Sequence, residues 1–154
     1  MRSNFHGVFS LILILASVLI ALAYMLIVSL GWGLIYLGLI ILVNPIVLYA
    51  YCAKCLCRDD KCSHVFPGKL TRLIPPRKQG PYTLMDYFWT ALSLIALFGF
   101  PIPWLWHSNV LFFGYWLLLL IGLAEILFFV CRTCRNENCP MCSLSEQQAH
   151  SDNT

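Results

Sequence analysis

The residues of this chain best suited to chemistry are its eight cysteines, which fall into two compact groups. The first group has the spacing C-x2-C-x-C-x4-C, with a histidine close behind it, and the second has the spacing C-x2-C-x4-C-x2-C. In chain order the candidate ligands are Cys52, Cys55, Cys57, Cys62 and His64, followed by Cys131, Cys134, Cys139 and Cys142. Inert cysteines placed by chance would not gather in two sets of four, so the pattern predicts sites that act through sulfur.

Metal binding is the chemistry that these spacings favour. Two cysteines separated by two residues can turn both sulfur atoms to one ion, and two such pairs supply the tetrahedral thiolate set that zinc prefers. The second group contains two such pairs on one short loop, although zinc ribbons usually place more residues between their pairs. Four thiolates also hold [2Fe–2S] or [4Fe–4S] clusters, but neither common ferredoxin spacing is present. We therefore predict zinc as the cofactor, with an iron–sulfur cluster as the alternative.

The first group leaves its ligand set open. Cys57 adds a C-x-C spacing, so the site can use four thiolates, or three thiolates together with the imidazole of His64. His64 can equally be an exposed loop histidine without a ligand role. The two groups can also exchange ligands and form mixed sites. Cysteines beside a membrane, such as Cys52, Cys55 and Cys57, can instead carry palmitoyl groups.

The rest of the sequence has the composition of a membrane protein. Of its 154 residues, 60% are hydrophobic and 11% are charged, whereas soluble domains carry about 25% charged residues. A helix needs about 20 apolar residues to cross the hydrocarbon core of a bilayer. Four apolar runs reach or approach this length, at residues 8–28, 34–50, 87–100 and 110–130. A cleaved signal peptide is the alternative for the first run, but the apolar stretch continues past the small residues Ala21 and Ala23.

The positive charges indicate how these spans are oriented. All ten lysines and arginines lie outside the four runs and outside both hairpin tips: Arg2, Lys54, Arg58, Lys61, Lys69, Arg72, Arg77, Lys78, Arg132 and Arg135. The positive-inside rule then places both termini and the long middle loop in the cytosol, beneath the plasma or inner membrane, while Trp32, Trp104 and Trp106 mark the opposite interface. All the cysteines would share the cytosolic face, where reducing conditions favour metal ligands or redox thiols over disulfides.

These observations predict a fold class and an organisation for the chain. We expect an all-α integral membrane protein with four transmembrane helices as two hairpins, and two small Cys-rich metal-binding loops on the cytosolic face. The predicted segments are a first transmembrane hairpin (1–51), a cytosolic Cys-rich loop (52–85), a second transmembrane hairpin (86–130) and a cytosolic Cys-rich C-terminal tail (131–154). Each half is a hairpin followed by a C-x2-C pair, which is the layout of a parallel pseudo-repeat. Thr83 and Asp86 have the spacing of a capping box.

A few polar and small residues inside the spans suggest local roles. Glu125, the only charge in the last run, either hydrogen-bonds to the interface or a neighbouring helix, or handles a proton, a quinone or an ion. We expect Pro45 to kink the second helix and Asn44 to hydrogen-bond across the bundle. Five glycines are expected to allow close helix packing: Gly31, Gly33, Gly38, Gly114 and Gly122. The four histidines lie near membrane edges or in the tail, so the sequence does not predict a haem site.

Several classes of function can be excluded or ranked. The sequence has no hydrolase elbow, phosphate-binding loop, dinucleotide fingerprint or HExxH helix, so we expect no self-contained enzyme. Acidic residues offset much of the positive charge, leaving a net charge of +3, and we expect no nucleic-acid partner. The favoured function is a membrane-embedded accessory or anchor subunit whose cytosolic cysteines bind zinc and dock another membrane or cytosolic subunit. The alternatives are an electron-transfer subunit with iron–sulfur or redox-active thiols, and a protein that handles soft metal ions.

Overall fold

The computed structural model describes residues 2–50, 52–54, 75, 77 and 82–131, and the regular structure of these residues is helical. The elements, in chain order, are α1 (Arg2–Val28), α2 (Leu30–Ala50), the 3₁₀ turn η1 (Cys52–Lys54), α4 (Leu84–Gly99), the short α5 (Ile102–Leu105), α6 (Asn109–Glu125) and the π-helical turn η4 (Ile126–Val130). The all-α architecture predicted from the apolar runs is confirmed.

Within the described residues, four helical segments are long and apolar enough to cross a membrane, which makes the chain a candidate multi-pass membrane protein. The candidate spans are Phe5–Val28, Leu30–Lys54, Leu84–Leu105 and Asn109–Val130. In the most apolar stretch of each span only 17–28% of the residues are buried, so most apolar side chains face away from the bundle. Lipid is the environment that suits such a surface, because exposed apolar side chains of this density would be costly in water.

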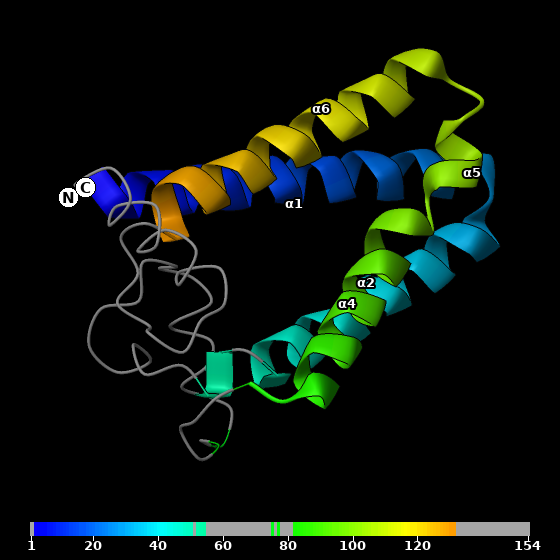
Figure 1. Ribbon diagram of the computed structural model, residues 1–154. Coiled ribbons are helices and arrows are strands. Elements are labelled where there is room, and N and C mark those ends of the chain that lie inside the picture. The colour runs from blue at the N-terminus through cyan, green and yellow to red at the C-terminus, as the bar shows by residue number, and fades with distance from the viewer. Residues whose placement is uncertain (1, 51, 55–74, 76, 78–81, 132–154) are drawn as a thin grey trace.

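The helices form two antiparallel pairs, each made of one helix from either hairpin. The first and last long helices, α1 and α6, pack along each other, and α2 packs along α4. We call these pairs the α1–α6 arm and the α2–α4 arm. Figure 1 shows that the arms meet at one end, beside α5, and diverge toward the other. The chain connects α1 to α2, and α4 through α5 to α6, as the two predicted hairpins require. The most extensive packing, however, joins helices of different hairpins: α1 packs on α6, and α2 packs on α4.

The turn between α1 and α2 is tighter than the sequence suggested. The apolar runs at residues 8–28 and 34–50 leave five residues between the first two predicted spans, but α2 begins at Leu30 and only Ser29 is non-helical. The Ser29 amide donates to the Met25 carbonyl (2.8 Å) and the Gly33 amide donates to the Ser29 carbonyl (3.0 Å), so helical hydrogen bonds continue across the break. A Cβ atom on Gly33 would lie 2.5 Å from a Leu26 side-chain carbon and 2.8 Å from its Cα. The reversal therefore requires glycine here.

Of the five glycines expected to allow close helix packing, only Gly33 and Gly122 lie at a close contact between helices. A Cβ atom on Gly122 of α6 would lie 2.8 Å from Ile14 and 3.3 Å from the Ser10 carbonyl oxygen, so the close approach of α1 and α6 depends on this glycine. Gly31, Gly38 and Gly114 have open space where a Cβ would stand, so the expectation of close packing was wrong for them.

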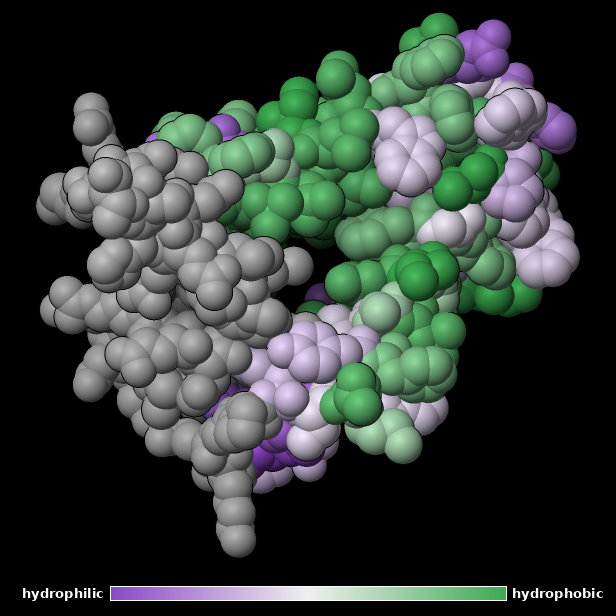
Figure 2. Space-filling view, viewed as in Figure 1, coloured by the Kyte–Doolittle hydropathy of each residue, from purple (hydrophilic) through white to green (hydrophobic). Residues whose placement is uncertain are grey.

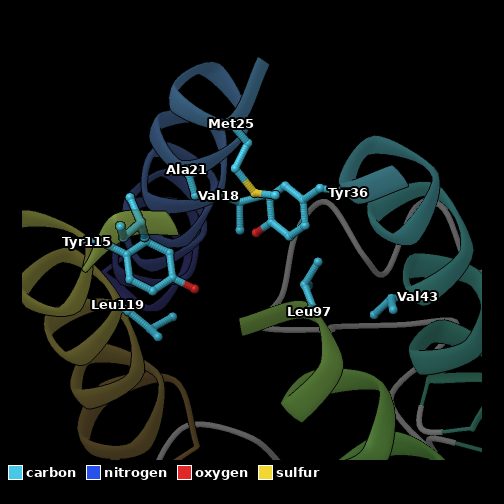
Figure 3. Packing of buried hydrophobic residues seen from close by; sticks show 9 residues of the cluster. Val18, Ala21, Met25, Tyr36, Val43, Leu97, Tyr115 and Leu119 are labelled. Atoms are coloured by element: carbon cyan, nitrogen blue, oxygen red, sulfur yellow. The ribbon is translucent and has the colours of Figure 1, made fainter. Parts of the chain in front are cut away.

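The end at which the arms meet is held by apolar and aromatic packing. A buried cluster takes residues from all four long helices, and Figure 3 shows Val18, Tyr36, Leu97 and Leu119 converging from different helices. The Tyr115 hydroxyl of α6 donates to the Phe98 carbonyl of α4 (3.0 Å), which ties one arm to the other. Carbonyls in the last turn of a helix lack an intrahelical donor, so this bond also satisfies the end of α4.

The tips of the two hairpins also join through aromatic rings. The rings of Trp32 and Trp104 have centroids 5.2 Å apart, and the Phe100 ring lies 5.3 Å from Trp104 and 5.9 Å from Tyr36. Aromatic pairs at these separations add stability beyond the area they bury. The tryptophans that the sequence assigned to one membrane interface, Trp32 and Trp104, therefore do lie together at one end of the molecule.

The tight turn predicts unequal effects of two glycine substitutions in α2. Gly33→Ala should destabilise the protein by about 1–3 kcal/mol, the usual cost of overpacking, because the new methyl group meets the Leu26 backbone. Gly38→Ala adds the same methyl group in open space in the same helix, so it should be neutral or slightly stabilising. Thermal unfolding in detergent measures both, and equal melting temperatures for the two variants would contradict the described turn.

Candidate functional site

Two of the nine predicted ligands lie within the described residues, and both follow the last helix of a candidate span. Cys52 is the first residue of η1, two residues after the end of α2 at Ala50, and Cys131 directly follows η4. Figure 1 shows these two helix ends on different arms, at the end where the arms have diverged. Across the described residues no group of three or more His, Cys, Asp and Glu is placed to hold a metal ion.

The other predicted ligands fall outside the described residues: Cys55, Cys57, Cys62, His64, Cys134, Cys139 and Cys142. Their ligand roles, and the cofactor itself, therefore stay predictions. What the structure does describe is how the helix ends that lead into the two cysteine groups are held.

The start of α4 carries the capping box expected from the sequence. The Thr83 hydroxyl oxygen accepts the Asp86 amide (3.4 Å), and the Asp86 carboxylate accepts the Thr83 amide (3.0 Å). This reciprocal pairing satisfies amide groups that a helix start leaves without intrahelical partners. It also explains why α4 begins at Leu84, three residues before the apolar run at residue 87.

Asp86 does more than cap its helix, because its carboxylate also binds two cations. Lys54 Nζ lies 2.5 Å from Oδ2, and Arg77 Nη1 lies 2.8 Å from Oδ1. The Lys54 and Asp86 side chains are only 9% and 6% exposed. A charge that is buried this deeply needs a partner, since an unpaired one costs several kcal/mol. Asp86 therefore holds the end of α2 and the start of α4 together.

The same carboxylate fixes the position at which the first cysteine group begins. Lys54 stands between Cys52 and Cys55, so its bond to Asp86 anchors the first C-x2-C pair to α4. Arg77 closes the connection from the other side: its amide donates to the Ala53 carbonyl (3.3 Å) and its guanidinium lies 4.8 Å from the centre of the Tyr49 ring. Lys54 and Arg77 thus bind the same carboxylate from the two ends of the connection, and together they hold the residues around Cys52 against α4.

The other arm has a corresponding polar contact near its open end. His6 Nδ1 of α1 lies 2.8 Å from Glu125 Oε2 of α6, with the side chains 29% and 20% exposed. The His6 ring also stacks on Phe129 of η4, with centroids 4.5 Å apart. Of the roles considered for Glu125, a hydrogen bond to a neighbouring helix is confirmed. The contact holds α6 to α1 six residues before Cys131.

The two contacts occupy equivalent places in the two halves of the chain. Each joins the first helix of one hairpin to the end of the last helix of the other, as a parallel pseudo-repeat requires. Tyr36 and Tyr115 strengthen the correspondence, because each is the seventh residue of its helix and each is fully buried. In one contact the acid lies on the first helix of a hairpin (Asp86), and in the other it lies on the last helix (Glu125). Equivalent positions of the two halves therefore carry different residue types, so the sequences of the halves do not reveal the two contacts.

Sequence reasoning missed the partners in both contacts. The sequence predicted Asp86 only as a helix cap, so its ion pairs with Lys54 and Arg77 were not predicted. His6 was placed only near a membrane edge, without a partner. A usable signal was present, because acidic and basic residues lie near the same end of the spans that form each arm, and ionisable groups in spans are normally paired.

Asn44 was assigned the wrong partner. Its Nδ2 donates to the Ile40 carbonyl of its own helix (2.8 Å), and its side chain is exposed, so the expected hydrogen bond across the bundle is not formed. A short amide can reach the carbonyl of the preceding turn, and this local bond competes with tertiary partners.

Asp86 predicts a large loss of stability when its charge is removed. Asp86→Asn keeps the shape but leaves Lys54 buried without a counter-charge, which typically costs about 3–5 kcal/mol. Glu125→Gln is the matched control, because the other arm's contact is more exposed and the amide oxygen can still accept from His6. Thermal unfolding in detergent should show the larger drop for Asp86→Asn, and a drop no larger than that of Glu125→Gln would contradict the anchoring role.

Comparison of this chain with protein-family models, curated proteins and solved structures found no match. The geometry supports a candidate multi-pass membrane protein with four spans, whose two cysteine groups begin at the ends of two separately anchored arms.

Proposed function

We propose that this protein is a small membrane anchor or accessory subunit that holds zinc in two cysteine sites on its cytosolic face and docks a partner subunit there. The observation that supports it best is the Asp86 anchor: a buried carboxylate fixes Lys54, which stands inside the first C-x2-C pair. A membrane helix end with no task beyond the bilayer would not need this arrangement of buried charge, which is expensive to maintain.

The arms argue for two separate sites rather than one shared site. Cys52 starts from the α2–α4 arm and Cys131 from the α1–α6 arm, and the arms have diverged at that end (Figure 1). Each group contains four cysteines, enough to complete a tetrahedral zinc site by itself. Closed sites of this kind are structural, because they leave no position open for substrate. A structural role in docking therefore fits better than catalysis.

The charges support a cytosolic position for the cysteine groups. Lys54 and Arg77 lie beside the start of the first group, while Trp32 and Trp104 lie at the opposite end of the spans, where the arms meet. Basic residues collect on the cytosolic side of membrane proteins, and tryptophans favour the interfaces. In the reducing cytosol the thiols stay free to bind metal.

Elemental analysis of the purified protein tests the two zinc sites. We expect about two zinc atoms per chain and no visible absorbance, as two four-thiolate sites predict. Cys55→Ser and Cys134→Ser should each remove one zinc atom and leave the other in place, while Ser143→Ala, next to the second group, should change nothing. A brown protein with absorbance in the visible would replace zinc with an iron–sulfur cluster. Full zinc content in both cysteine variants would refute the proposed ligands.

Thiol labelling of intact cells tests the orientation separately. A membrane-impermeant maleimide added outside should leave the native cysteines unmodified until the membrane is permeabilised. His107→Cys provides the control, because His107 is exposed near the end where the arms meet, and it should react from outside. Labelling of the native cysteines in unbroken cells would place both groups on the external face and remove the argument for reduced thiols.

A further inference from the structure

The separation of the two arms leaves a space within the candidate membrane region. Figure 2 shows a hollow between the surfaces of the α1–α6 arm and the α2–α4 arm, and Figure 1 shows that the arms diverge there. At its closed end the space is bounded by apolar side chains from both arms, among them Val18 and Leu119 on one side and Val43 and Leu97 on the other (Figure 3).

Helical spacing leads us to place one polar side chain, Asn44, on the side of α2 that faces this space. Asn44 follows Gly33 by eleven residues, which in a helix is three turns plus about 20°, so the two residues share one side of α2. Gly33 faces Leu26 of α1, on the opposite arm. Asn44 stands about 16 Å further along the helix, where the arms have separated, and its side chain is exposed.

The Asn44 amide is only partly satisfied. One of its two Nδ2 hydrogens goes to the Ile40 carbonyl, and neither the second hydrogen nor Oδ1 has a partner among the described residues. The next residue, Pro45, has no amide hydrogen, so the Ile41 carbonyl one turn earlier also loses its helical donor. Asn44 lies about 21 Å from the start of the span at Leu30 and about 15 Å from its end at Lys54, which is hydrocarbon depth.

Unpaired amide groups at this depth are costly, and membrane proteins normally place them against a partner or a ligand. The Tyr36 hydroxyl is also without a partner in the described part of the chain, but it is fully buried, so no ligand can reach it without a rearrangement. The Thr90 hydroxyl is likewise buried without a partner. Among the described residues, Asn44 differs from both in being exposed as well as only partly paired. Its amide offers one donor and one acceptor, which matches the hydroxyl or carbonyl head of a neutral amphiphile.

We propose that the space between the arms binds a neutral, membrane-soluble molecule whose hydroxyl or carbonyl head hydrogen-bonds to Asn44. The apolar walls suit a hydrocarbon body, and entry from the bilayer needs no aqueous path. A charged head does not fit, because the ionisable side chains of the contacts described in the spans lie toward the membrane edges, at His6, Lys54, Asp86 and Glu125. The proposal does not depend on the zinc sites.

Photolabelling in phosphatidylcholine nanodiscs tests this site with two probes. One is a decyl benzoquinone and the other a diacylglycerol, each with a photoreactive group in its tail and each competed with its unlabelled form. We expect saturable labelling of the protein by at least one probe. Asn44→Leu should raise the half-saturating mole fraction about tenfold, the effect of losing one buried hydrogen bond, while Asn44→Gln should change it by less than about threefold.

Ser17→Ala serves as the matched control for a polar group inside a span. Ser17 also bonds a carbonyl of its own helix, at Ile14 (2.7 Å), but it is fully buried, so this variant should bind like the wild type. Labelling by the quinone alone would identify a carbonyl head, and labelling by the diacylglycerol alone a hydroxyl head. No saturable labelling by either probe, or equal half-saturation in Asn44→Leu and the wild type, would overturn the proposal.

Discussion

The arrangement of this protein depends on how positive charge is neutralised where the chain leaves and re-enters the candidate membrane region. Lys54 ends the second span and Asp86 lies in the first turn of the third, and the two form a buried ion pair that Arg77 and Thr83 complete. Removing either partner would strand a charge, so the pair acts as a fixed joint between α2 and α4. The first cysteine group begins at this joint, and its position is therefore set by the fold of the membrane domain.

The opposite end of the molecule is held by a different kind of interaction. There the Gly33 turn, the rings around Trp104 and the Tyr115 hydrogen bond to Phe98 bring all four helices together without charge. Close packing of this kind needs matched shapes, which is why a single Cβ at Gly33 would not fit. The charged contacts at the other end join the helices within each arm and do not join the arms to each other. The arms therefore diverge away from the apolar end, and the space beside Asn44 follows from that.

Features that depend on local composition were predictable, and features that depend on tertiary contacts were not. Apolar runs reveal the four spans because hydrocarbon thickness sets their length, and Thr83 and Asp86 reveal a helix start because a capping box is local. The pairing of α1 with α6, rather than within a hairpin, leaves no trace in the periodicity of the runs. The partner of Asn44 was misassigned for the same reason, because a hydrogen bond across the bundle depends on the distance between the arms, which the sequence does not show.

The candidate site was predictable to a similar degree. Cysteine spacing names the ligand chemistry, because ligands that share an ion must lie close in the chain or in space. Cysteine spacing does not show which other residues hold those ligands in position. Lys54 is the informative example: within the motif it is one of two unspecified residues, and only the fold shows that it reaches Asp86. Residues that orient ligands often carry as much of a site's design as the ligands do.

The two anchors differ in a way that bears on the proposed sites. The Lys54–Asp86 pair is buried and shared with Arg77, whereas the His6–Glu125 contact is more exposed and is described with one hydrogen bond and a ring stacked on Phe129. A single hydrogen bond typically contributes about 1 kcal/mol to stability, whereas breaking a buried ion pair costs about 3–5 kcal/mol. The fold alone therefore positions the start of the first group more firmly than the start of the second. Within the proposed function, the second cysteine group therefore depends more on its bound metal for its folded structure. Its two chelating pairs on one short loop suit this role, because metal-binding energy at such a site is also folding energy.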